Sequence, residues 1–417
     1  MNYNDALKFI DSDDKRGHNR SLDTISRLLL LLGDPQDALK FIHLTGTNGK
    51  GSTANFISSI LESGGYKTGL FTSPHILSIN ERFQINHNQI KDDEFAYYIT
   101  RIKDVLHENK DLKPTYFEIT VALGMLYFKE NNVDIVVLEV GIGGRVDPTN
   151  IIKTAVASVF TPISIDHRER LGNTAEEAAI EKSGIIKKNS VVVSYFNSNK
   201  INEIIRNKAE SQDSKICFLD MNDIKIISSD LNGSHFIYSG EEYHIRQIGI
   251  HQVYNASLAI LTIKSIDLNI NDDIIKNAIS NIQWPARMTI EKKSPITIID
   301  GAHNEHGFDS LIKNINHIDR ERLIICLGIM KDKDIGPNLK ELIGMADVVL
   351  FTKIEYERAM PENKLKDLFP SVNYHTFSKL EDAVVFSQQI ANTNDLVIFT
   401  GSLYMAGELI KLFEINK

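Results

Sequence analysis

The chain has 417 residues, a length that predicts two or three domains. Its formal net charge of −9 and its pI near 5.8 disfavour a nucleic-acid partner. The N-terminal stretch has no apolar signal region, and the run at 28–32 is far shorter than the ~20 residues that span a bilayer. We therefore expect a cytoplasmic protein with no membrane partner, in which Cys217 and Cys326 are buried, unpaired thiols.

The segment FIHLTGTNGKGST, at 41–53, predicts a strand that leads through a glycine-rich turn into a helix N-terminus. Backbone N–H groups in such a turn converge on an anion, the helix dipole favours negative charge, and Lys50 adds a cation. The spacing departs from the usual phosphate loop, because Gly46 and Gly49 are only two residues apart and Gly51 follows Lys50. The alternative is a glycine-rich turn without a ligand. We favour an ATP site made by Thr47, Asn48, Gly49, Lys50, Gly51 and Ser52.

Short apolar runs alternate with helical patterns from residue 40 to about 215, which predicts βαβ units and a mainly parallel sheet. Residues 216–248 alternate over shorter runs, broken by Asn232-Gly233 and Gly240, which is typical of β-hairpins. Strands are expected at 41–45, 68–71, 135–139, 156–160 and 191–194. Helices are expected after residues 50, 91, 116, 174 and 200, and then at about 251–266 and 274–282.

A second alternating series follows Trp284-Pro285, with strands expected at 296–300, 323–327, 348–351, 372–375 and 396–399. We predict an α/β protein of two domains. A larger P-loop ATPase domain with a mainly parallel sheet spans residues 1–290, and a smaller Rossmann-like α/β domain spans residues 291–417. Ligands of open α/β sheets bind at the carboxyl ends of the strands, and clefts often lie between domains.

Polar side chains follow several strands of the first predicted domain. Glu139 ends one strand, and a carboxylate there is placed to hold magnesium beside a nucleotide. Asp166-His167 and Ser73 occupy the same kind of position after neighbouring strands. The rival interpretation of the glycines after Glu139, a dinucleotide fingerprint, fails because Val146 stands where a third glycine is needed. A solvated acidic strand end remains the plain alternative.

In the second predicted domain, Asp300 and His303 follow the first strand in the segment DGAHN. Charged and imidazole groups so close together suggest a site that faces the first domain. Arg287, beside the boundary, could reach a phosphate and neutralise developing charge, although a surface arginine is the plain alternative.

The assembled motifs resemble those of folylpolyglutamate synthase/dihydrofolate synthase, within the Mur ligase superfamily. Any one of them could be chance, but the ordered set is specific. They are GTNGKGST at 46–53, FTSPH at 71–75, NER at 80–82, EVGIGGRVDPTN at 139–150, IDH at 165–167, LGNT at 171–174, EKSGIIK at 181–187, HQVYNA at 251–256, WPAR at 284–287, DGAHN at 300–304, KDKD at 331–334 and TGSLY at 400–404.

The resemblance implies an ATP-dependent amide ligase. In this family ATP phosphorylates a substrate carboxylate, and the amino group of L-glutamate attacks the acyl phosphate. The acceptor would be a reduced folate, and the form of GGRVDPTN adds a weak indication for dihydropteroate. The resemblance also implies a monomer.

The resemblance assigns roles by motif. Lys182 matches the lysine that the family carries as a carbamate, which would bind a second magnesium; a surface lysine is the alternative from the residues alone. Phosphates would contact Gly49, Lys50 and Gly51; magnesium would bind Ser73, Glu139 and His167; ATP would contact Asn255, Arg287 and Asp300; His303 would lie near the transferred phosphate or glutamate; and folate would contact Arg82, Arg145 and Asp147.

Two other functions remain as alternatives. A Mur ligase of cell-wall synthesis has the same chemistry but places another domain ahead of the ATPase domain, and only 45 residues precede Gly46 here. A P-loop kinase or ATPase without ligation gives no role to DGAHN in a second domain. Departures from the family pattern are modest: Ser183 and Pro148 replace alanine, and Glu305 replaces proline.

Overall fold

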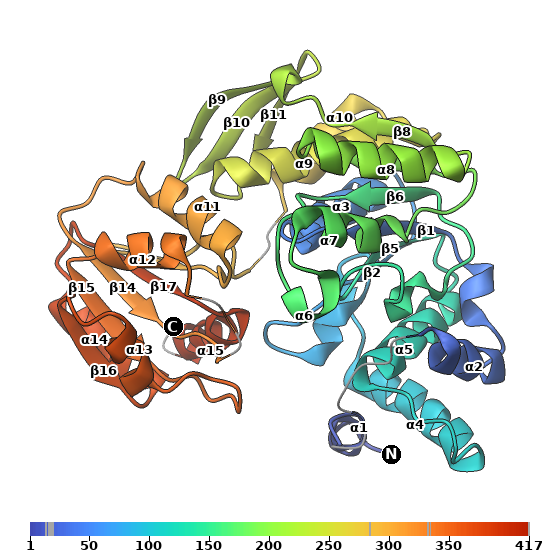
Figure 1. Cartoon of the computed structure of the whole chain (residues 1–417), viewed down its shortest axis with the longest axis horizontal. Helices are drawn as coiled ribbons and strands as arrows, with labels where there is room; N and C mark the ends of the chain where they lie inside the picture. Colours follow the sequence, from blue (N-terminus) through green and yellow to red (C-terminus); the bar gives the residue numbers. More distant parts are fainter. Residues whose placement is uncertain (13–14, 16–20, 283–284, 332, 334, 416–417) are drawn as a thin grey trace. The chain divides into compact units, whose positions relative to one another are not determined.

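The computed structural model describes residues 1–12, 15, 21–282, 285–331, 333 and 335–415. The chain divides into two compact units that interleave in sequence (Figure 1). Unit 1 comprises Met1–Lys225, Ile237–Tyr243 and Tyr254–Ile282, and unit 2 comprises Ile226–Phe236, His244–Val253 and Gln283–Lys417. A single functional boundary at residue 290 stays a prediction. Trp284, Asp332 and Asp334, from the WPAR and KDKD motifs, lie outside the described residues.

Unit 1 contains an eight-stranded sheet in the order β4-β3-β2-β5-β1-β6-β7-β8. The pairs are parallel except those of β3 with β2 and β4. The central strand β1 is buried along its whole length, and His43 and Thr45 are buried there together with its apolar side chains. The strands are β1 (Phe41–Thr45), β2 (Thr68–Phe71), β3 (Phe83–Ile85), β4 (Asn88–Gln89), β5 (Ile135–Glu139), β6 (Ala157–Phe160), β7 (Val191–Ser194) and β8 (Lys215–Phe218).

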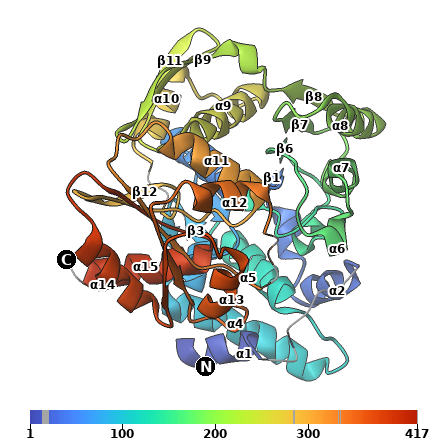
Figure 2. The same ribbon diagram turned by 60° about the vertical axis from the view of Figure 1, so that its left-hand side comes forward.

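Helices flank this sheet (Figures 1 and 2). Helices α2, α4 and α5 share a hydrophobic core with β1, β2 and β5, whereas α7 and α8 share another with β6 and β7. The helices of the first 282 residues are α1 (Tyr3–Ile10), α2 (Asp23–Leu31), α3 (Lys50–Ser63), α4 (Asp92–Glu108), α5 (Tyr116–Glu130), α6 (Arg168–Leu171), α7 (Ala175–Ser183), α8 (Asn199–Ser211), α9 (Ile250–Ser265) and α10 (Asp272–Ser280), with the short 3₁₀ turns η2 (Pro35–Ala38), η3 (Ile79–Arg82), η4 (Pro148–Ile151) and η5 (Met221–Asp223).

The predicted hairpins form a separate three-stranded sheet, in the order β11-β10-β9, made by β9 (Ile224–Asp230), β10 (Gly233–Tyr238) and β11 (Glu241–Ile245). The prediction is wrong for the start of that region, because β8 instead extends the parallel sheet beside β7. β8 is an edge strand with one partner, so Cys217 on it is only half-buried, whereas Cys326 is buried as expected.

Unit 2 contains a six-stranded sheet in the order β12-β13-β17-β14-β15-β16, parallel except for the pair β12–β13. Strand β12 was not predicted and covers the stretch that we interpreted as a boundary. Helices α11 and α12 lie side by side (Figures 1 and 2). The elements are β12 (Thr289–Lys293), β13 (Ile296–Ile299), α11 (Glu305–Ile315), β14 (Leu323–Leu327), α12 (Pro337–Gly344), β15 (Val348–Thr352), α13 (Glu362–Leu368), β16 (Tyr374–Phe377), α14 (Leu380–Ile390), β17 (Leu396–Thr400) and α15 (Leu403–Ile415).

The prediction of two α/β domains with mainly parallel sheets is confirmed. Within the part of the chain that the structure describes, no helix combines the length and apolar character needed to cross a bilayer.

Candidate functional site

The turn between β1 and α3 requires glycine at two positions. Gly46 has a φ of 150°, and a Cβ there would lie 1.9 Å from Oγ1 of Thr161 at the end of β6. Gly49 has a φ of 85°, and a Cβ there would lie 2.5 Å from Oδ1 of Asn255 on α9. Both backbone angles disfavour L side chains, and both close approaches exclude them. The turn is therefore pressed between β6 and α9.

Side chains of the turn stabilise its shape by hydrogen bonds to backbone groups. The Thr47 hydroxyl donates to the Ser164 carbonyl and accepts from the Ser164 N–H, both at 2.9 Å. Lys50 Nζ donates to the carbonyls of Gly46 and Thr47 at 3.2 Å. The first four N–H groups of a helix, counted from its N-cap, are not used by the helix's own hydrogen bonds, and in α3 they include those of Gly49, Lys50 and Gly51. The turn can thus offer main-chain N–H groups and one ammonium to an anion.

Lys182 reaches the same turn from α7. Its Nζ donates to the Gly46 carbonyl at 2.7 Å, and the residue is 3% exposed. Burial and, to a smaller extent, the charge of Lys50 lower the pKa of Lys182 to about 7, although Asp166 and Asp147 oppose the shift. Two lysine side chains thus meet at one carbonyl oxygen, and one of them, Lys182, is about half neutral amine near pH 7.

The buried carboxylate of Glu139 lies at the end of β5, next to the end of β2. Glu139 is 4% exposed, and its Oε2 accepts the backbone N–H of Ser73 at 2.9 Å. Phe71 and Leu138 are paired in register, which explains why the residues after these two strands come together. The structure therefore brings two of the three predicted magnesium ligands, Ser73 and Glu139, into one place.

His167 lies in an exposed turn at the start of α6. Its φ is 49°, its backbone N–H donates to Asp166 Oδ1 at 2.8 Å, and its side chain is 41% exposed. Among the described residues, no three His, Cys, Asp or Glu side chains are grouped as a metal site. The predicted ligand set has only Glu139 and His167 of those types, and its carboxylate and hydroxyl oxygens are donors that suit magnesium.

The residues predicted to contact folate have different surroundings. Asp147 is 4% exposed, and its carboxylate accepts the N–H groups of Ile142 and Thr149, at 2.9 and 3.0 Å, and the Thr149 hydroxyl at 2.5 Å. Burial outweighs these bonds and raises the pKa of Asp147. Arg145 is largely exposed and pairs with Glu181 at 2.9 Å. Asp147 therefore shapes the loop, whereas Arg145 lies at its surface.

Arg82, the third residue of this set, is 6% exposed at the end of η3. Its Nε donates to Nδ1 of His75 at 3.0 Å, and its guanidinium lies 5.5 Å from the centre of the Tyr116 ring. The arginine, the imidazole and the aromatic ring form one cluster beside the FTSPH segment.

In unit 2, Asp300, which follows β13, lies close to Arg287, which precedes β12. The Asp300 carboxylate accepts the N–H groups of Met288 at 3.0 Å and Ala302 at 2.9 Å. Burial raises the pKa of Asp300, and the charge of Arg287 opposes that shift. A Cβ on Gly301 would lie 3.1 Å from Nη1 of Arg287. The guanidinium therefore packs directly on the DGAHN turn.

The imidazole of His303 is oriented by its own turn. Its Nδ1 lies 2.9 Å from the Gly301 carbonyl, and because a carbonyl oxygen only accepts, Nδ1 is the donor. In the neutral ring, Nε2 is then the basic nitrogen. Asn304 caps α11 by accepting the N–H of Gly307 at 2.9 Å. Glu305, which departs from the family pattern, accepts the N–H of Asn338 at 3.0 Å and joins α11 to α12.

Comparisons with known proteins decide the family. The Mur ligase middle domain matches residues 44–263, more than half of the chain, and the Mur ligase glutamate ligase domain matches residues 286–403. The "Dihydrofolate synthase/folylpolyglutamate synthase" of Bacillus subtilis is 32% identical over 98% of this chain and 98% of its own length. The chain belongs to the folylpolyglutamate synthase/dihydrofolate synthase family of Mur ligases.

Two further members of this family are similar over nearly their whole length. The "Folylpolyglutamate synthase" of Lacticaseibacillus casei is 32% identical, with 97% of each chain covered. A solved structure of the Mycobacterium tuberculosis folylpolyglutamate synthase, complexed with ADP, superposes with a TM-score of 0.90 at 28% identity and covers 99% of this chain and 98% of that one. These neighbours support the two-domain Mur ligase fold.

The family site residues fall into two groups. The group in unit 1 contains Lys50 with Lys182, Ser73 with Glu139, and Asn255 beside Gly49. The group in unit 2 contains Arg287, Asp300 and His303. That the two groups act on one substrate stays a prediction.

Two histidines near these groups belong to the family motifs, but the sequence alone predicts no role for them. His75, from FTSPH, is the partner of Arg82. His251, from HQVYNA, is half-buried; desolvation and the charges of Arg287 and His306 lower its pKa to about 4. Each could have been suspected only from its place inside a motif, because neither contact follows from sequence spacing.

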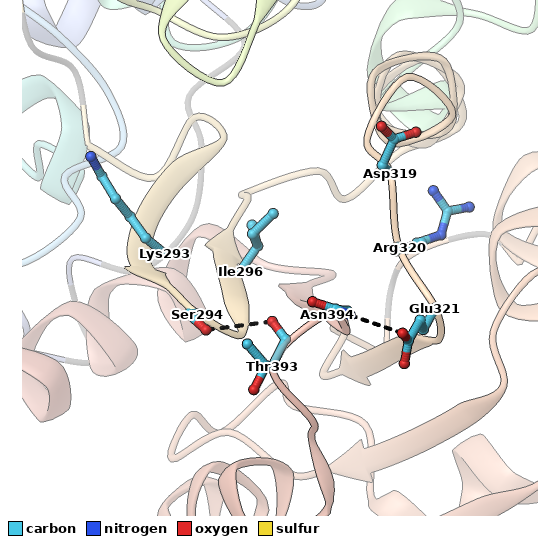
Figure 3. Close-up of a pocket in the computed structure, with 8 residues that line it drawn as sticks. All are labelled: Lys293, Ser294, Ile296, Asp319, Arg320, Glu321, Thr393 and Asn394. Carbon is cyan, nitrogen blue, oxygen red and sulfur yellow. Dashed lines mark hydrogen bonds between the residues drawn. The ribbon is translucent and has the colours of Figure 1, made fainter.

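A cavity of about 530 Å³ lies in unit 2 (Figure 3). It is at the amino ends of β13, β14 and β17, whereas Asp300 follows the carboxyl end of β13. Asn394 donates to Glu321 at 2.8 Å, and both residues line the cavity. The lining residues are Lys293, Ser294, Ile296, Asp319, Arg320, Glu321, Thr393 and Asn394. No predicted site residue lines this cavity.

Proposed function

We propose that this protein is an ATP-dependent ligase that adds L-glutamate to a reduced folate through an acyl phosphate. The observation that supports it most directly is the meeting of Lys50 and Lys182 at the Gly46 carbonyl, in the same unit as the buried carboxylate of Glu139. Such a turn suits nucleotide phosphates. The L. casei and M. tuberculosis relatives are named folylpolyglutamate synthases, and the latter is solved with ADP.

The reaction has two steps. The folate carboxylate attacks the terminal phosphate of ATP, which forms the acyl phosphate and releases ADP. The amine of L-glutamate then attacks the acyl carbon, and the tetrahedral intermediate expels phosphate as the amide forms. A carboxylate is a poor electrophile, and phosphorylation gives its oxygen a good leaving group.

The chain's own residues neutralise charge and move a proton in these steps. Lys50 and Arg287 would offset the negative charge that builds up on the phosphates. His303 Nε2 would accept a proton from the attacking amine, because its Nδ1–H is held by Gly301. The N–H groups at the start of α3 would bind phosphate oxygens.

Ser73, Glu139 and His167 would hold one magnesium ion, and a carbamate on Lys182 would help to hold a second. Magnesium, when bound, supplies the positive charge that lets two anions approach each other. The partly neutral amine of Lys182 is the form that can react with CO₂ to become that carbamate. The carbamate would replace the positive charge of Lys182 with anionic oxygens, which can bind the metal ion.

We further propose that dihydropteroate is a second acceptor. The B. subtilis relative carries both names, and this chain has Arg145 and Asp147 in GGRVDPTN. Arg82, His75 and Tyr116 would meet the acceptor, because they combine a buried cation with an aromatic face. We place the enzyme in the cytoplasm as a monomer; the unpaired Cys217 and Cys326 accord with a reducing compartment.

The test is ADP release with magnesium and L-glutamate, comparing dihydropteroate with a reduced folate and weighing the products by mass spectrometry. We expect glutamate-dependent turnover and a product that is one glutamyl unit heavier. The active acceptor then shows whether the enzyme has one activity or two. ATP hydrolysis that ignores glutamate would instead favour a P-loop kinase or ATPase, and ligation only onto cell-wall precursors would favour the other Mur ligases.

A further inference from the structure

The turn between β10 and β11 sets two histidines face to face. Ser239 and Gly240 form a two-residue connection with φ of 50° and 85°, both positive as in a type I′ hairpin. Such a turn pairs the residues at equal distance on either side of it. Three residues beyond the paired strand ends, this pairing sets His235 on β10 opposite His244 on β11. Their ring centroids are 4.3 Å apart, with the planes tilted by 35°.

The pair lies on the more exposed face of the small sheet formed by β9, β10 and β11, which Figure 1 labels. His235 is exposed and His244 is half-buried, whereas the adjacent Phe236 and Ile245 are completely buried. Partial burial lowers the pKa of His244, and the charges of His235 and Arg246 lower it further. Near neutral pH this imidazole is therefore uncharged and has a nitrogen lone pair to offer.

We propose that His235 and His244 form a chelating site for a divalent transition-metal ion such as Zn²⁺ or Ni²⁺. Neutral imidazole is the commonest protein ligand for these ions, with metal–nitrogen bonds of about 2.0–2.1 Å. Two rings that face each other at 4.3 Å need only side-chain rotation to direct one nitrogen each toward a common ion. Among the described residues no third His, Cys, Asp or Glu is grouped with the pair, so water completes the coordination sphere.

This site differs in chemistry from the proposed magnesium site and does not depend on the proposed function. Magnesium prefers hard oxygen ligands and competes poorly for imidazole nitrogen. The alternation of side chains along β11 puts the acidic Glu242 on the same face as His244, and the basic Arg246 directly follows the strand. The local charge is therefore nearly balanced, and the two imidazoles determine the affinity.

Calorimetric titration of the full chain with Zn²⁺ tests the proposal, with excess Mg²⁺ present to occupy oxygen sites. The variants are H235N and H244N, and the matched control is H317N, which changes an exposed histidine outside the pair. We expect wild type and H317N to bind one equivalent with micromolar affinity, and each pair variant to bind at least tenfold more weakly. Unchanged binding by H235N and H244N, or an equal loss in H317N, would overturn the site.

A second measurement needs no variant and guards against misfolded ones. The chain has 13 histidines, and ¹⁵N imidazole spectra follow each ring as Zn²⁺ is added. We expect two rings to shift together at one equivalent, and the response to fall more than tenfold between pH 7.5 and pH 5.5, because the ligating rings must lose their protons. Shifts of no ring, or of many rings in proportion to their exposure, would refute the chelate.

Discussion

Lys182 is a site residue whose protonation state differs from what its residue type suggests. An ordinary lysine with a pKa of 10.5 is less than about 1% neutral at pH 8, whereas at a pKa of about 7 roughly nine-tenths of Lys182 is neutral. Only the neutral amine reacts with CO₂, forming an N–C bond and losing a proton. The proposed carbamate is therefore favoured above pH 7 and lost as the pH falls through that value.

We predict that removing CO₂ lowers ligation by wild type and that bicarbonate restores it, with the larger response above pH 7. Lys182→Ala should lose roughly 100-fold or more in ligation rate and recover in part with a short carboxylic acid. The matched control is Lys188→Ala, an exposed lysine that pairs with Asp213 at 3.8 Å and should stay near wild type. Near-normal turnover by Lys182→Ala would show that this residue has only a structural role.

Glu139 is the second residue with a specific prediction. Glu139→Gln keeps an oxygen to accept the Ser73 N–H but removes the negative charge that magnesium needs. We expect ligation to fall roughly 100-fold with little change in the melting temperature, since one neutral group replaces a buried ion. The control is Glu130→Gln, which changes an exposed carboxylate that pairs with Arg101. Turnover within a few-fold of wild type would show that Glu139 does not bind the magnesium ion.

At the scale of elements, two glycines show which part of a substitution's cost comes from the backbone angle and which from close packing in the turn between β1 and α3. Gly49 and Gly65 have nearly equal φ, 85° and 89°, but a Cβ on Gly65 meets no atom within 4 Å, whereas one on Gly49 lies 2.5 Å from Asn255 Oδ1. Each change to alanine should cost about 1–2 kcal/mol from the backbone angle alone. Only Gly49→Ala should also displace the turn.

We therefore predict that Gly49→Ala binds ATP at least tenfold more weakly than wild type, while Gly65→Ala binds it normally. Urea unfolding measures the free-energy cost of each variant, and equilibrium titration measures the nucleotide affinity. Equal ATP affinity in the two variants would mean that the turn does not hold the nucleotide.

The same scale shows what the sequence could reveal. Strands such as β1 and β5 are buried along their whole length, so their mainly apolar runs gave the right bounds. β8 has four residues and one neighbour, and nothing in so short a run distinguishes a parallel edge strand from a hairpin. Motifs placed Lys182 near the site, but its bond to Gly46 spans 136 positions and could come only from the fold.

For the whole molecule, the sequence predicted two α/β domains but not their interleaving. Strands β10 and β11 each pass from one unit to the other partway along, after Phe236 and Tyr243. Local patterns identify strands without saying which core each half joins, because that is decided by long-range packing. The division of the site residues follows these units: the phosphate turn lies in unit 1 and His303 in unit 2.

This division predicts that the two chemical steps can be separated by mutation. His303→Gln removes the basic Nε2 of an imidazole that Gly301 orients, so it should stop the attack by glutamate while leaving phosphorylation of the folate intact. Hydroxylamine traps an acyl phosphate as a hydroxamate and so measures the first step without glutamate. We expect His303→Gln to form hydroxamate at a near-normal rate but glutamyl product roughly 100-fold more slowly. Glu139→Gln should lose both, and the exposed control His317→Gln should lose neither. If His303→Gln also fails to form hydroxamate, this histidine acts at the transferred phosphate, and the assignment of the second step to unit 2 is wrong.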